Sequence, residues 1–250
     1  MKYLIFILSL FSYSAQAYDF EGTPEFLFNS SEASSQSETW SQVFELISAD
    51  GSNTLMTSSF PDVLLKPAST MKIFTAWWAI QKAFRTDTYL AEMLKKSVNY
   101  MADDTAQGLG GVLALEDFYR DQGLPISDDS FQAADGSGLS YSNKTTCKVQ
   151  VELLKLIRRN NHYDRFKELM AQPGETGTLQ NRLSSLKGRL FAKTGTLKKT
   201  ASLSGFLETN KGTIVFCILS DFLIIPVSEA RIKIDRIIKK HDSLVTQSTK

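Results

Sequence analysis

The chain has 250 residues, of which 42% are hydrophobic, so it is long enough to bury the core of one compact domain. Its 28 Lys and Arg residues nearly balance its 27 Asp and Glu residues. A surface with this balance has no general attraction for a polyanion, which argues against binding to nucleic acid. Only two histidines are present, His162 and His241, and no Cys/His cluster has metal-ligand spacing. We therefore expect neither a metal nor another cofactor.

The first 17 residues have the pattern of a cleavable export signal. Lys2 precedes a short apolar run over residues 3–11, and Ala15-Gln-Ala17 fits a small-residue cleavage site. We expect residues 1–17 to be a signal peptide and the mature protein to be periplasmic or secreted. An uncleaved membrane anchor is the alternative, although the apolar run is only about half of a membrane span. Residues 18–39 are polar and rich in Ser and Glu, which predicts a flexible N-terminal segment.

The rest of the chain predicts a single domain over residues 40–240, followed by a frayed tail over 241–250. An Asp50-Gly51 turn predicts a hairpin of strands over 40–48 and 54–58. Hydrophobic periodicity predicts helices over 69–84, 90–107, 111–122 and 147–160, the last with Thr146 as its N-cap. Strands follow over 189–194, 201–208 and 213–220, with an amphipathic helix over 228–240. This order predicts an α+β fold: an antiparallel sheet from 40–68 and 186–240, with a helical region over 69–185.

The chain has two cysteines, Cys147 and Cys217, and the sequence allows them to be either paired or free. They can form a disulfide in an oxidising compartment. Cys217 lies in a predicted buried strand and Cys147 at a predicted helix start, so unpaired structural thiols are the favoured interpretation.

Ser69 and Lys72, within Ser69-Thr-Met-Lys72, are the candidate nucleophile and base. A serine hydroxyl needs a neighbour that takes its proton, and a side chain three positions along a helix lies on the same face. A desolvated lysine has a lowered pKa and can serve as that base, whereas two histidines make a His-based triad an unfavourable alternative. A second S-x-x-K at Ser184–Lys187 is attributed to surface composition.

Two further motifs, Ser97-Val-Asn99 and Lys193-Thr-Gly-Thr196, each follow a pattern found once in the chain. The order S-x-x-K, S-x-N, K-T-G resembles the signature of serine β-lactamases and penicillin-binding proteins. The resemblance implies that Ser97 relays a proton between Lys72 and the leaving amine, and that Asn99 binds the substrate backbone.

The same resemblance assigns substrate binding to the K-T-G segment. Lys193 and Thr194 would bind the terminal carboxylate of the substrate, and Gly195 would leave room for the substrate along the strand edge. Thr196 would also contact substrate, and the backbone N–H groups of Ser69 and Thr196 would form the oxyanion hole.

Longer segments are similar to the penicillin-binding protein 4-type, or class C, D-alanyl-D-alanine carboxypeptidases and endopeptidases. These segments are Lys66–Lys72, Asp135–Ser140 and Gly177–Arg182, and we interpret the last two as scaffold rather than chemistry. Members of that family usually carry large extra domains between the first two motifs, yet only 28 positions separate Ser97 from Ser69. The resemblance therefore implies a minimal form without the inserted accessory domains.

The resemblance implies that the protein forms an acyl-enzyme at Ser69, that its substrates are peptidoglycan peptides and that β-lactams inhibit it covalently. An uncovered groove favours an endopeptidase that cleaves D-Ala–diaminopimelate cross-links, with D-Ala-D-Ala carboxypeptidase activity alongside. A β-lactamase, a transpeptidase and a non-catalytic peptidoglycan- or β-lactam-binding protein are the alternatives. The Glu residues between the last two motifs lack the E-x-x-L-N context of class A β-lactamases. A wall hydrolase endangers its producer, which suggests a periplasmic inhibitor protein as a partner.

Overall fold

The computed structural model describes residues 37–247; the predicted signal peptide and nearly all of the segment over 18–39 lie outside this range. A five-stranded antiparallel sheet has the order β2-β1-β7-β6-β5. Its strands are β1 (Thr39–Ser48), β2 (Asn53–Ser59), β5 (Leu190–Leu197), β6 (Thr200–Thr209) and β7 (Gly212–Asp221). β1 pairs with β7 from Thr39 opposite Asp221 to Ser48 opposite Gly212, which confirms that both halves of the chain build one sheet.

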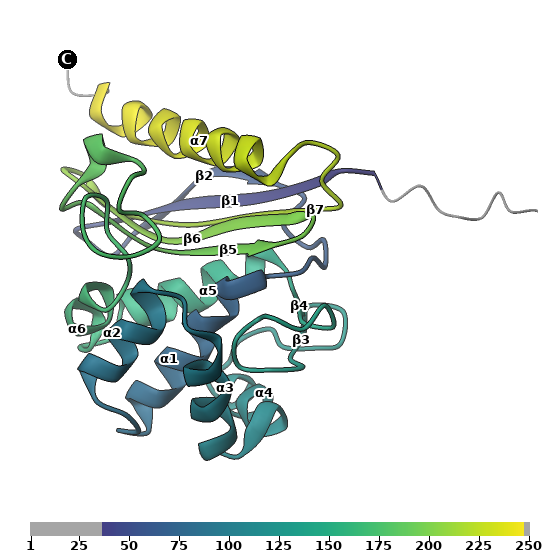
Figure 1. The fold of residues 1–250 in the computed structure, drawn as a ribbon. Coiled ribbons are helices and arrows are strands. Elements are labelled where there is room, and N and C mark those ends of the chain that lie inside the picture. Colours follow the sequence, from purple (N-terminus) through teal and green to yellow (C-terminus); the bar gives the residue numbers. More distant parts are fainter. Residues whose placement is uncertain (1–36, 248–250) are drawn as a thin grey trace, which may run out of the picture. The chain divides into compact units, whose positions relative to one another are not determined.

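Helices cover both faces of this sheet (Figure 1). One face carries α7 (Val227–Gln247), and the other carries the helical region. That region contains the short helix η1 (Ala68–Met71), the helices α1 (Lys72–Gln81), α2 (Asp87–Lys95), α3 (Asn99–Gly108), α4 (Gly111–Asp121), α5 (Cys147–Arg158) and α6 (Tyr163–Glu168), and the small strands β3 (Phe131–Gln132) and β4 (Lys144–Thr145). The short helix η2 (Ser184–Leu186) belongs to the α7 side, where Leu186 packs in the same hydrophobic cluster as Ile234 of α7. In residues 37–247, no helix has the length and apolar character needed to cross a membrane.

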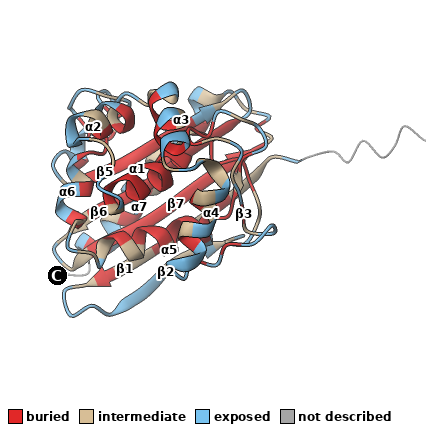
Figure 2. Ribbon diagram, turned by 90° about the horizontal axis from the view of Figure 1, so that it is seen from below, coloured by how far each residue is buried: buried red, intermediate tan, exposed pale blue. Residues whose placement is uncertain are grey.

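Two hydrophobic clusters, one on each side of the sheet, form the core. Strands β6 and β7 are buried along nearly their whole length because helices cover both of their faces (Figure 2). Helix α1 is enclosed by its neighbours, and every residue from Lys72 to Ile80 is buried. The first residue of this central helix is a lysine, so the fold carries an ammonium group into the protein interior.

The prediction of one continuous helix over 90–107 is wrong, because the structure has two helices in this range. α2 ends at Lys95, α3 begins at Asn99, and Ser97 between them has φ of +62°, in the left-handed region. Apolar residues continue at helical spacing across the junction, so the sequence pattern contains no sign of this break.

The prediction of a frayed tail over 241–250 is also wrong for residues 241–247, because these residues form the last part of α7. His241 is only 4% exposed, and its ring stacks on Phe44 of β1 at 3.6 Å between ring centroids. Its Nε2 lies 2.9 Å from Thr57 Oγ1 on β2, so an aromatic and a polar contact hold this part of the helix on the sheet.

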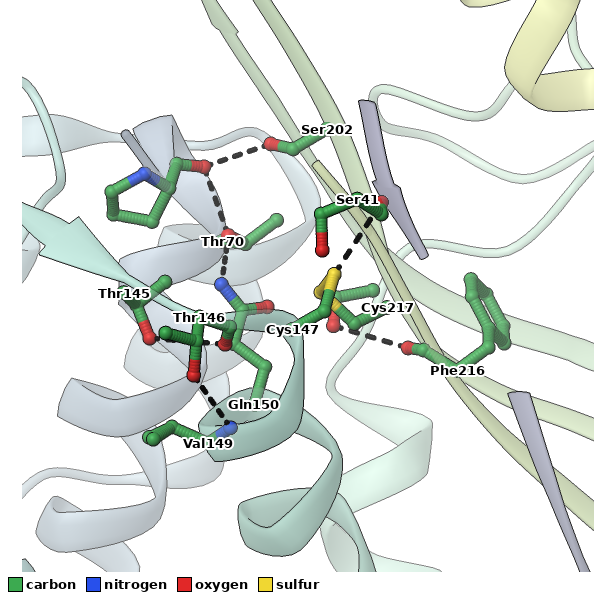
Figure 3. Close-up of a disulfide and its surroundings, with 12 residues drawn as sticks. Ser41, Thr70, Thr145, Thr146, Cys147, Val149, Gln150, Ser202, Phe216 and Cys217 are labelled. Atoms are coloured by element: carbon green, nitrogen blue, oxygen red, sulfur yellow. Dashed lines mark hydrogen bonds between the residues drawn. A yellow bond between two sulfur atoms is a disulfide. The ribbon is translucent and has the colours of Figure 1, made fainter. Parts of the chain in front are cut away.

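Cys147 and Cys217 form a disulfide, which corrects the expectation of free thiols (Figure 3). The Thr146 side chain accepts a hydrogen bond from Val149 N at 3.1 Å, so it caps α5 as predicted and fixes where the helix begins. That first turn packs on β7, and the two Cα atoms lie 5.3 Å apart, within the range a disulfide spans. The sequence places the cysteines in different elements but does not show that these elements meet.

We expect the disulfide to contribute about 4 kcal/mol to the free energy of unfolding, because it closes a loop with a sequence separation of 70 in the unfolded chain. Denaturant unfolding with and without reductant measures this contribution. Reductant should destabilise the wild type toward the level of the Cys147→Ala/Cys217→Ala double variant and leave the variant unaffected. A wild type whose unfolding midpoint ignores complete reduction would contradict this prediction.

Candidate active site

Strand β5 is the edge of the sheet, and it presents the K-T-G segment to one side of the helical region. Ala192 N donates outward to Ala171 O at 3.0 Å, so with the two-residue period of a strand the N–H groups of Thr194 and Thr196 also point outward. Lys193 and Gly195 face the helical region, and the two threonines face the α7 side. The outward N–H of Thr196 has the direction that an oxyanion donor on this edge requires.

Ser69 lies in the 3₁₀ turn η1, and α1 begins only at Lys72, so the helix predicted from residue 69 starts with a tighter turn. Two hydrogen bonds hold the turn through the Pro67 carbonyl, which accepts from Ser202 Oγ at 2.8 Å and Thr70 Oγ1 at 2.9 Å (Figure 3). Ala68 has φ of +49°, in the left-handed region that disfavours side chains. The backbone before the candidate nucleophile is therefore held in a specific, strained conformation.

Gly195 makes the contact between β5 and this turn possible. A Cβ at this position would lie 2.8 Å from Pro67 O and 2.1 Å from Ser202 Oγ. The missing side chain thus lets the turn pack against the sheet. The sequence suggested another reason for a glycine here, namely room for the substrate. Its contact with substrate stays a prediction.

Lys72 has the partners expected of a base for Ser69. Its Nζ lies 3.1 Å from Ser69 Oγ and donates to Asn99 Oδ1 and to Ser137 O, each at 2.7 Å. Because the ammonium only donates, Asn99 must turn its carbonyl toward Lys72, and its Nδ2 amide remains a donor for a ligand. One asparagine can therefore orient the base and bind substrate.

Burial sets the charge of Lys72. The residue is fully buried, and desolvation lowers its pKa more than the charges of Asp103 and Asp135 raise it, so the pKa is about 8. Neutral Lys72 is thus accessible near physiological pH, which is the state that can take a proton from Ser69.

Ser97 has a different lysine partner from the predicted one. Lys193 Nζ donates to Ser97 Oγ at 2.8 Å and to Thr194 O at 2.9 Å, whereas the Nζ of Lys72 bonds Ser69, Asn99 and Ser137. Lys193 is fully buried, and burial together with the nearby charge of Lys72 lowers its pKa well below the usual range. Two serine–lysine pairs therefore lie side by side, and a proton leaving through Ser97 has Lys193 as its immediate neighbour.

The segment Asp135–Ser140 is the scaffold that holds Lys72, in agreement with its interpretation from sequence. The Asp135 carboxylate accepts from the backbone N–H groups of Gly138 and Ser140, both at 2.6 Å. A Cβ on Gly138, which has φ of +80°, would lie 1.8 Å from Ala68 O. The tight loop thereby contacts the nucleophile turn and aims the Ser137 carbonyl at Lys72.

These motifs meet at a cavity of about 420 Å³. It is lined by Ser69, Ser97, Asn99, Thr178, Arg182, Thr194, Thr196 and Arg231. Sequence reasoning assigned Arg182 and Thr178 to scaffold and missed Arg231, which no motif marks and which only the packing of α7 brings to the cavity. Among the described residues, no Asp or Glu lines it.

The antiparallel sheet with helices on both faces, and three motifs converging on its edge strand, define the penicillin-binding-protein and serine β-lactamase fold. A predatory endopeptidase of Bdellovibrio bacteriovorus, solved in complex with an immunity protein, matches this fold with a TM-score of 0.70 at 14% identity. That match covers 84% of this chain and 94% of the other.

The family is narrower than the fold. The model of the D-Ala-D-Ala carboxypeptidase 3 (S13) family matches residues 81–240, a range that includes Ser97, Asn99 and Lys193 and begins after Lys72. The chain belongs to this family, which confirms the resemblance seen in the sequence.

Two curated relatives match over about half of the chain. D-alanyl-D-alanine carboxypeptidase DacB of Haemophilus influenzae is 30% identical over 139 residues, covering 49% of this chain and 29% of that protein. A D-alanyl-D-alanine carboxypeptidase of Actinomadura sp. is 29% identical over 138 residues, covering 52% of this chain and 25% of that protein. The chain thus spans less than a third of the length of either relative.

The pKa of Lys72 makes a prediction about the pH dependence of Ser69 acylation. The rate constant for acylation by a fluorescent penicillin should rise with pH, with a midpoint at about 8, and level off at higher pH, because neutral Lys72 is the active form. Asp103→Asn removes a charge that raises this pKa, so the midpoint should move to lower pH. Asp104→Asn, on the exposed neighbour that pairs with Arg85, is the matched control and should leave the midpoint unchanged. Equal midpoints in all three proteins would contradict this role of Lys72.

Proposed function

We propose that the chain is a serine-type peptidoglycan DD-peptidase that forms an acyl-enzyme at Ser69. The observation that carries the proposal is the 3.1 Å contact between Lys72 Nζ and Ser69 Oγ inside a cavity that the S-x-N and K-T-G segments also line. Membership of the S13 family supports the same reaction class.

The geometry supports the following sequence of steps. Ser69 Oγ attacks the carbonyl carbon of the D-Ala residue and transfers its proton to neutral Lys72. The N–H groups of Ser69 and Thr196 stabilise the oxyanion, an effect of about 3–4 kcal/mol per donor. The carbon–nitrogen bond then breaks, and the proton that Lys72 took from Ser69 passes through Ser97, which Lys193 holds by a hydrogen bond, to the leaving amine. Water then attacks the ester and gives a proton to Lys72, which is neutral again. Lys72 returns this proton to Ser69 Oγ as the ester bond breaks and the acid product leaves.

For the substrate, we propose D-Ala–diaminopimelate cross-links, with terminal D-Ala-D-Ala cleaved alongside. Between α1 and the Ser97 turn the chain forms only α2 and short connections, so in this interval no inserted domain covers the cavity. A groove without such a cover suits a bulky branched peptide as well as a linear one.

The cavity lining does not favour the β-lactamase alternative. In class A β-lactamases a Glu is the base that positions water for rapid hydrolysis of the acyl-enzyme, and no carboxylate among the described residues lines the cavity. We therefore propose that β-lactams acylate Ser69 and are released slowly. All the side chains that the reaction needs are present, so nothing here favours a non-catalytic binding protein.

The proposal includes export, which depends on the residue pattern over 1–17, outside the described residues. It also includes a protective inhibitor protein of the producing cell. The fold relative solved with an immunity protein is a precedent for such a partner, in that protein. A periplasmic extract passed over the immobilised chain tests it, and recovery of no specific partner would count against it.

Digestion of purified cross-linked sacculi tests the enzymatic proposal. The wild type should convert dimeric muropeptides to monomers and shorten pentapeptide stems, and Ser69→Ala should do neither because it lacks the nucleophile. Chromatography of the released muropeptides, with mass identification, measures both reactions. Shortened stems with intact dimers would reject the endopeptidase part, and unchanged muropeptides of both kinds would reject DD-peptidase activity.

A further inference from the structure

Arg231 is an arginine of α7 that reaches the cavity from the side opposite the helical region. Its Nη2 donates to Thr196 Oγ1 at 2.9 Å, directly beyond the K-T-G residues of β5. The residue is exposed and lines the same cavity as Ser69. No sequence motif includes it, and neither the mechanism above nor the family resemblance uses it.

The other positively charged side chains around the cavity already have hydrogen-bond or ion-pair partners. Lys72 and Lys193 are fully buried and hydrogen-bonded to the two serines and their surroundings. Arg182 is neutralised by Asp235, which accepts from its Nη2 at 2.7 Å and its Nε at 3.2 Å. Arg231, by contrast, has no carboxylate within 4.0 Å in residues 37–247. It is thus the one lining residue among those described that presents an exposed, unneutralised charge to the cavity.

The backbone that carries Arg231 is fixed. Arg182 Nη2 lies 3.5 Å from Arg231 O, and the ion pair of Arg182 with Asp235 ties the next turn of α7 to the same guanidinium. Thr196, the hydrogen-bond partner of Arg231, has its N–H directed outward at the strand edge. A guanidinium held here, with several N–H donors in a planar fork, matches a carboxylate.

We propose that Arg231 binds the carboxylate of the substrate's leaving group, together with the hydroxyls of Thr194 and Thr196. This inference rests on the proposed DD-peptidase function. Terminal D-Ala and the D-centre of diaminopimelate both carry a free carboxylate on the carbon bonded to the scissile nitrogen, so one anchor serves both reactions. The role replaces the direct carboxylate contact expected for Lys193, whose ammonium is fully buried and faces Ser97.

The test compares two acylating probes, benzylpenicillin and its methyl ester, in which a methyl group removes this charge. The penicillin carboxylate stands on the carbon bonded to the lactam nitrogen, the position it has in the peptide substrate. Acylation rate constants are measured by intact-protein mass for the wild type and Arg231→Gln. Arg236→Gln, on an exposed arginine of the same helix that does not line the cavity, is the matched control.

Arg231→Gln should slow acylation by benzylpenicillin roughly ten- to a hundredfold, the usual effect of losing a charge-assisted hydrogen bond, and leave acylation by the ester nearly unchanged. Arg231→Lys should recover part of the loss, and Arg236→Gln should match the wild type with both probes. An equal loss with both probes would show a structural role and overturn the proposal, as would no loss with either. A wild type that neither probe acylates would instead reject the proposed function itself.

Discussion

The buried ammonium of Lys72 is the group on which the arrangement of the site depends. An ammonium removed from water costs several kcal/mol unless protein groups replace its hydration. Ser69 Oγ, Asn99 Oδ1 and Ser137 O do so here, and each belongs to a different segment. Satisfying one lysine therefore brings together the nucleophile turn, the start of α3 and the loop at Asp135. The residual cost of burial is the lowered pKa that makes the lysine a base.

The sheet supplies the second half of the site because it is built from both ends of the chain. Pairing of β1 with β7 leaves β5 at the edge, where its outward N–H groups face the cavity. Because the side chains of β5 alternate between the two faces, Lys193 and Gly195 face the helical region, whereas Thr194 and Thr196 face α7. The cavity lies where these two layers meet at the edge strand. The helical region therefore supplies the residues that react, and α7 supplies the proposed carboxylate anchor.

Much of this was predictable from the sequence because short-range patterns determine it. Strand alternation predicted the sheet, and the i, i+3 spacing of Ser69 and Lys72 predicted their contact. The left-handed turn at Ser97 was not predictable, because apolar periodicity continues across it, and the Ser97–Lys193 pair depends on that turn. The disulfide between Cys147 and Cys217 and the arrival of Arg231 in the cavity depend on packing between elements far apart in the chain. Neither leaves a local signal in residue spacing.

Intact-protein mass spectrometry after incubation with benzylpenicillin tests most directly whether Ser69 is the activated nucleophile. The structure predicts one stable adduct of the mass of the drug on the wild type, located on the peptide that contains Ser69, and no adduct on Ser69→Ala. An adduct that persists on Ser69→Ala, or a wild type that stays unmodified without hydrolysing the drug, would contradict it.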